Sequence, residues 1–88
     1  MVVKIRGILL RFTNYESTIE LRVPTVRAAL TELTERYPEM REVLLDRSGS
    51  VRPTHLIALN GEVLPPEEFD RPSSDDDRVD IVTAVSGG

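Results

Sequence analysis

The chain has 88 residues, a mass of 9.9 kDa and a formal net charge of −4, which is the size of one small acidic domain. It has no cysteine and one histidine, which excludes disulfides, thiolate nucleophiles and thiolate or histidine-rich metal sites. The longest apolar run, 56–59, is far shorter than the roughly 20 residues that cross a bilayer, and the acidic balance disfavours nucleic acid. We therefore expect one domain over residues 1–88 that binds no metal and acts in the cytoplasm.

Alternating apolar and polar residues predict two strands near the N-terminus. The alternation over 3–6 resumes over 10–12, but one residue out of phase. Gly7 between them predicts a bulge that resets the register. The clearest alternation runs over 18–23, and the polar segment 13–17 is expected to join the two strands as a hairpin.

From Val26 to Tyr37 the apolar period lengthens to that of an amphipathic helix, with apolar residues at i, i+3, i+4, i+7 and i+11. Thr25 precedes this segment and is the expected N-cap. Glu32 and Arg36 are spaced to pair on the outer face. Pro38 ends the helix near Tyr37, because the residue before a proline avoids the helical region.

The second half of the chain supplies the remaining strands. Asn60-Gly61 is a strong signal for a two-residue turn. The segments are predicted in order as helical turns over 40–44, a loop over 46–50, a short buried strand over 56–59, an extended segment at 63–64, a surface connection over 65–77 and a final strand over 79–85. This order predicts an α+β domain with one main helix packed across a mixed sheet.

Several polar residues fit structural roles better than sites. His55 lacks a second metal ligand, so it is expected at the surface or at a strand end. The run 75–77 with Asp80 lacks the glycine and the bidentate glutamate of a calcium loop, so it is predicted as a solvated turn. Three arginines could share one strand face, although the acidic total argues against nucleic acid: Arg6, Arg11 and Arg22.

The sequence closes on Gly87-Gly88 directly after the last predicted strand. With glycine at about 7% of residues, such a pair arises at this place by chance in roughly 0.5% of chains. A frayed end is the alternative that the dipeptide alone leaves open. A glycine tail behind a strand would instead hold the Gly88 carboxylate where it can enter the active site of another protein, through a channel too narrow for side chains.

At this point the chain resembles the β-grasp sulfur carriers over essentially its whole length. The resemblance is closest in 35–46, 51–53, 59–62 and 79–88. The family includes the small subunit of molybdopterin synthase, the thiamin sulfur carrier, the carrier for thiocarboxylate-dependent cysteine synthesis and archaeal ubiquitin-like modifiers. The resemblance implies a β-grasp, ubiquitin-like fold in which the chain carries sulfur and is not itself an enzyme.

The resemblance assigns the chemistry to the end of the chain. A carboxylate is a poor electrophile, because its oxygen is a bad leaving group. A partner enzyme that uses ATP and magnesium would convert the Gly88 carboxylate to an acyl-adenylate, and a sulfur nucleophile would then give a thiocarboxylate. Gly87 and Ser86 would form the tail that enters the partner. A second partner, a biosynthetic enzyme, would accept the sulfur.

Exposed apolar residues are the expected docking contacts. Val79 and Ile81 take the inward phase of the last strand, which leaves Val82 outward. Val63 follows the Asn60-Gly61 turn, and Ile8 is exposed if Gly7 forms a bulge. In the molybdopterin-type carriers, apolar residues at positions matching Val82, Val63 and Ile8 contact the adenylating enzyme.

Three other functions stay open at this stage. The protein could be the small subunit of molybdopterin synthase, or a ubiquitin-like modifier that joins Gly88 to target lysines. It could also be an interaction domain whose glycines are incidental. The sulfur recipient is equally open between cysteine, a pterin, a thiolated tRNA base and a specialised metabolite.

Overall fold

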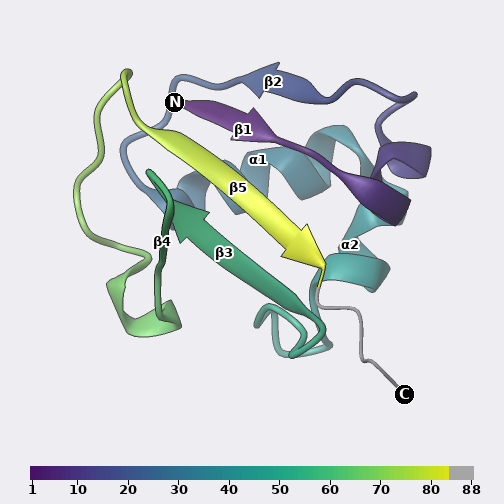
Figure 1. Cartoon of the computed structure of the whole chain (residues 1–88). Coiled ribbons are helices and arrows are strands. Elements are labelled where there is room, and N and C mark those ends of the chain that lie inside the picture. The colour runs from purple at the N-terminus through teal and green to yellow at the C-terminus, as the bar shows by residue number, and fades with distance from the viewer. Residues whose placement is uncertain (84–88) are drawn as a thin grey trace.

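The computed structural model describes residues 1–83, in which five strands form one mixed sheet and two helices cover one of its faces (Figure 1). The strand order is β2-β1-β5-β3-β4. The strands are β1 (Val2–Lys4), β2 (Thr18–Glu20), β3 (His55–Leu59), β4 (Glu62–Val63) and β5 (Arg78–Thr83). The helices are α1 (Val26–Arg36) and α2 (Pro38–Leu44), with 3-10 turns η1 (Gly7–Phe12) and η2 (Pro66–Glu68). The predicted α+β, β-grasp fold with one main helix across a mixed sheet is confirmed.

The sheet has one parallel pair, between β1 and β5, and its other pairs are antiparallel. Val3 lies opposite Ile19 of β2 and Val79 of β5, while Ile57 of β3 lies opposite Ile81. All five side chains are buried on the face that α1 covers. These cross-strand pairs and the apolar stripe of α1 make the core.

The helix α1 follows its predicted pattern closely. The Thr25 hydroxyl accepts a hydrogen bond from the Ala28 backbone N–H at 3.1 Å, as expected for an N-cap. The buried apolar side chains recur at helical spacing: Val26, Ala29, Leu30 and Leu33. The helix ends at Arg36, which pairs with Glu32 at 3.0 Å, and Pro38 then opens α2 at its first position.

Replacing Thr25 with alanine is expected to lower the free energy of unfolding by about 1 kcal/mol, because the Ala28 N–H loses its acceptor. Urea denaturation followed by circular dichroism measures the change. Thr25→Ser keeps the hydroxyl and serves as the control. Equal stability of the alanine variant and the wild type would show that this cap contributes nothing.

The prediction that the first strand resumes over 10–12 is wrong, because residues 7–12 form the 3-10 turn η1. Gly7 has a φ of +63° and turns the chain out of the sheet, where a bulge would have kept it in. The turn inserts Leu9, fully buried, into the core. The buried Thr13 hydroxyl donates to the Glu16 carbonyl at 2.9 Å and fixes the return to β2. The antiparallel pairing of β1 with β2 is confirmed.

The segment predicted as a surface connection, 65–77, contributes to the core after all. Phe69 is buried, and its backbone carbonyl accepts from the Arg27 N–H at 3.0 Å. The Arg27 guanidinium also lies 5.9 Å from the centre of the Phe69 ring and contacts Asp70 at 2.7 Å. A single aromatic residue among charged neighbours has no periodicity that would reveal its burial.

The first residue of the chain is also part of the core. Met1 is buried, and its ammonium group donates to the Leu21 carbonyl at 2.9 Å. The Leu21 N–H donates in return to the Met1 carbonyl at 2.8 Å. This reciprocal pairing extends the contact of β1 with β2 by one step.

Candidate functional site

The central strand β5 leads to the predicted reacting end (Figure 1). The predicted strand 79–85 is confirmed as far as Thr83, where β5 ends. Ser86, Gly87 and Gly88 lie outside the described residues, so their role as a reactive tail stays a prediction. The site that the structure does describe is the root of this tail and the sheet face beside it.

The root of the tail is held by β3 and by a buried histidine. β5 pairs with β1 only as far as Asp80, whereas its pairing with β3 continues to Thr83, which lies opposite His55. The His55 Nε2–H donates to the Val43 carbonyl at 3.0 Å, because a carbonyl oxygen can only accept. Its Nδ1 lies 3.2 Å from the Thr83 hydroxyl. Two hydrogen bonds therefore anchor the point where the tail begins.

His55 lies at a strand end, which is one of the two positions predicted for it, and not at the surface. The residue is only 6% exposed. A lone histidine can be buried here because α2 and β5 supply a partner for each ring nitrogen, and no polar atom is left unsatisfied. Neither partner is close to His55 in sequence.

The outer face of the sheet carries exposed apolar side chains. Val82 is 42% exposed, while its neighbour Ile81 is fully buried, so the predicted strand phase is confirmed. Leu56 lies directly opposite Val82 and is 43% exposed, which corrects the prediction that 56–59 is a buried run. Val63 lies opposite Ala58 on the same face and is 62% exposed.

We call Leu56, Val63 and Val82 the apolar patch. Leu56 and Val63 also line one shallow cleft at the β3–β4 end of the sheet. Ile8 is exposed, although not through the predicted bulge at Gly7, because it lies in η1 and not on the sheet. The structure thus groups Val82 and Val63 with Leu56, which the sequence analysis missed. Only the register of β3 against β5 places Leu56 beside Val82, and the sequence of either strand alone does not show that register.

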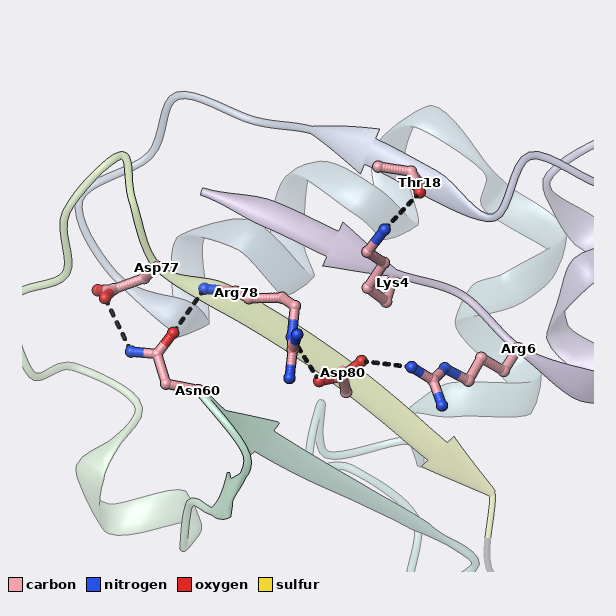
Figure 2. Close-up of polar contacts among 7 residues, drawn as sticks. All are labelled: Lys4, Arg6, Thr18, Asn60, Asp77, Arg78 and Asp80. Atoms are coloured by element: carbon pink, nitrogen blue, oxygen red, sulfur yellow. Dashed lines mark hydrogen bonds and ion pairs between the residues drawn. The ribbon is translucent and has the colours of Figure 1, made fainter.

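A polar cluster lies beside the apolar patch (Figure 2). The Asp80 carboxylate, only 10% exposed, contacts Arg6 Nη2 at 3.4 Å and Arg78 Nε at 3.1 Å. Lys4, opposite Asp80 in the sheet, donates to the Thr18 hydroxyl at 2.9 Å. The prediction that Asp80 belongs to a solvated turn with 75–77 is therefore wrong. Its carboxylate is held between two guanidinium groups.

The three arginines for which a shared strand face was considered do not form one patch. Arg6 follows β1 and contacts Asp80, Arg11 lies in η1, and Arg22 follows β2. The failed strand prediction over 10–12 explains the error, because the 3-10 turn removes Arg11 from the sheet. The sheet face instead joins Arg6 to Arg78.

The β3–β4 turn fixes the other end of β5 (Figure 2). Asn60 and Gly61 both have positive φ angles, 51° and 89°, as the predicted two-residue turn requires. The Asn60 side chain donates to Asp77 at 3.0 Å and accepts from the Arg78 N–H at 2.9 Å. Two hydrogen bonds lower the pKa of the Asp77 carboxyl: the one from Asn60 contributes most, and the one from the Ser74 N–H contributes next.

Over residues 1–83, no group of three or more histidine, aspartate or glutamate side chains is arranged to hold a metal ion. Within the same part of the chain, no helix is both long and apolar enough to span a bilayer.

Solved structures share this architecture. A complex of BexX and CysO from Amycolatopsis orientalis contains a chain that is 22% identical, with a TM-score of 0.82 over 99% of this chain and 98% of that one. CysO from Mycobacterium tuberculosis is 26% identical, with a TM-score of 0.82 over 96% and 98% of the two chains. The small archaeal modifier protein SAMP1 from Methanosarcina acetivorans is 23% identical, with a TM-score of 0.85 over 99% and 94%.

These likenesses define the class, which is that of β-grasp, ubiquitin-like proteins. No curated protein matches the sequence. The model of the ThiS family matches residues 3–88, and the chain belongs to that family. The resemblance to the β-grasp sulfur carriers is thereby confirmed.

Proposed function

We propose that the protein carries sulfur as a thiocarboxylate on Gly88. The observation that carries this proposal is the match to the ThiS family, which extends through the Gly87-Gly88 pair. The chain supplies the reacting group, and two partners supply the catalysis. One is an adenylating enzyme that uses ATP and magnesium, and the other is a biosynthetic enzyme that accepts the sulfur. The need for ATP favours the cytoplasm as the place of activation.

The proposed reaction needs no catalytic group from this chain. A Gly88 carboxylate oxygen attacks the α-phosphorus of ATP, and pyrophosphate leaves. Hydrosulfide then attacks the acyl carbon, AMP leaves with the electron pair of the broken C–O bond, and loss of the proton on sulfur completes the step. The resulting thiocarboxylate is a nucleophile toward the activated acceptor.

The scaffold supports such a role by anchoring the root of the tail. Thr83 is held through the pairing of β5 with β3 and through His55. A fixed starting point limits the space that the last residues search, which lowers the entropy cost of bringing a carboxylate to a partner's active site.

The apolar patch is the proposed contact with the adenylating enzyme, with Ile8 as a further contact outside the sheet. Exposed apolar side chains that share one surface mark interaction sites more often than scattered ones do. The BexX/CysO complex supports docking to a second protein in general, because a structural relative is found there in a complex.

Incubation with the cognate adenylating enzyme, ATP, magnesium and a sulfur source is expected to raise the intact mass by one oxygen-to-sulfur exchange. Fragmentation should map this exchange to Gly88. The control reaction lacks ATP and should leave the mass unchanged. Absence of both adenylate and thiocarboxylate with active partner would favour an interaction domain without carrier chemistry.

Conjugation to other proteins is the second candidate, favoured by the likeness to the modifier SAMP1. A tagged copy expressed in the native host and run on a reducing denaturing gel is expected to show mainly the free species. Mercury-affinity retardation should detect its thiocarboxylate. A ladder of adducts that requires Gly88 and survives thiol treatment would make the modifier function the better one.

A further inference from the structure

The outer face of the sheet carries a charge unlike that of the whole chain. The chain has a net charge of −4, yet this face presents three basic side chains, those of Lys4, Arg6 and Arg78 (Figure 2). The strand registers place two acidic side chains on it, Asp80 on β5 and Glu20 on the edge strand β2. The face thus carries three basic side chains against two acidic ones, with a third carboxylate, that of Asp77, held by Asn60 just before β5 (Figure 2).

Asp80 orders the two arginines. They reach it from different elements, Arg78 from β5 itself and Arg6 from the residues after β1. A carboxylate as buried as this one needs charged partners to offset its desolvation, and here each of its oxygens accepts from one guanidinium. These contacts in turn restrict the positions of the Arg6 and Arg78 side chains.

Each arginine keeps N–H donors that its contact with Asp80 does not use. Their side chains are 69% and 52% exposed, and the contact with Asp80 uses one N–H of each. A guanidinium has five N–H groups in a planar fork that matches a carboxylate. Each arginine can therefore bind a second carboxylate without leaving Asp80.

The apolar patch lies immediately beside this pair of arginines. Val82 is two residues from Asp80 on the same face of β5, and Leu56 lies opposite Val82. Arginine is enriched among the residues that dominate the binding energy of protein interfaces, and apolar side chains supply the buried area at their centres. A polyanion such as nucleic acid would meet the acidic remainder of the chain, whereas a protein with a few carboxylates beside an apolar contact fits the face.

We propose that Arg6 and Arg78, positioned by Asp80, form the electrostatic part of the docking surface, and that the partner presents carboxylates there. This inference rests on the proposed function, because the partner meant is the adenylating enzyme. The apolar patch supplies the buried contact, and the ordered arginines set the orientation in which the tail reaches the active site.

The test measures the dissociation constant for the cognate adenylating enzyme by calorimetry, at low and at high salt. Arg6→Glu and Arg78→Glu are each expected to weaken binding by about tenfold or more at low salt, and by less at high salt. Arg47→Glu, in the exposed loop after α2, makes the same charge change away from the face and should alter binding less than about twofold.

Asp80→Asn separates positioning from simple attraction. The variant makes the face more positive, so long-range attraction to an acidic partner alone would tighten binding. Loss of the ordered arginines instead predicts weaker binding, by about threefold or more. Circular dichroism checks that the variant folds, and Asp80→Glu, which keeps the charge of the face but displaces the carboxylate, provides the same test if it does not.

The outcomes distinguish this inference from the function on which it rests. A wild type that the active enzyme neither binds nor adenylates would overturn both. A wild type that is adenylated, together with charge reversals that bind as Arg47→Glu does, would overturn only the acidic partner surface. Tighter binding by Asp80→Asn would overturn the positioning role of Asp80.

Discussion

Deleting Gly88, or adding one residue after it, is expected to abolish adenylation while leaving thermal stability nearly unchanged. One residue moves the reacting carboxylate by about 3.5 Å. A misplacement of about 1 Å already costs on the order of a hundredfold in rate at a well-positioned reacting centre. The buried core that the structure describes lies within residues 1–81, so its packing is untouched. Adenylate formation measured by pyrophosphate release, with a thermal melt, tests both parts.

An extra residue within the exposed loop 46–50 is the matched control, and it should leave adenylation intact. Gly87→Val should block adenylation as the deletion does, because its β-branched side chain would not fit a narrow channel. Full activation of the extended protein would show that the end of the chain is not the reacting group.

Ile81→Asp is expected to reduce stability and Val82→Asp to reduce partner binding, although the two residues are neighbours. Ile81 is fully buried against Ile57, so an aspartate there should cost more than about 4 kcal/mol and unfold much of the protein. Val82 lies in the apolar patch, so its replacement should cost less than about 1 kcal/mol of stability and weaken binding to the adenylating enzyme.

Urea denaturation and calorimetric binding measure the two effects. Ile81→Val keeps an apolar side chain in the core and should lose only about 1 kcal/mol, which controls for altered packing. A stable Ile81→Asp together with an unfolded Val82→Asp would show that the two faces of β5 have been exchanged.

Features that depend on neighbouring residues were predictable from the sequence. The N-cap at Thr25, the apolar stripe of α1 and the turn at Asn60-Gly61 each follow from a few consecutive positions. The inward phase of Val79 and Ile81 follows from alternation within one strand. In these places the local pattern and the final packing agree.

Features that depend on distant pairings were not predictable. Leu56 and Asp80 became part of the site only through the register of β5 with its neighbours, which no single strand encodes. The buried position of His55 required partners from α2 and β5. Residues 7–12 have a strand-like alternation, but the core has room for Leu9 from a 3-10 turn.

If the protein is a modifier, its few amino groups limit how many copies can be joined to one another. Lys4 is the only lysine, and its ammonium group donates to Thr18 on the face proposed to bind the adenylating enzyme. The ammonium group of Met1 is occupied by the Leu21 carbonyl within the core. A second copy could therefore use only two amines, those of Lys4 and Met1, and each already donates a hydrogen bond. We expect attachment through Gly88 to build no extended polymers, and sulfur delivery to be one atom for each molecule and each cycle of activation.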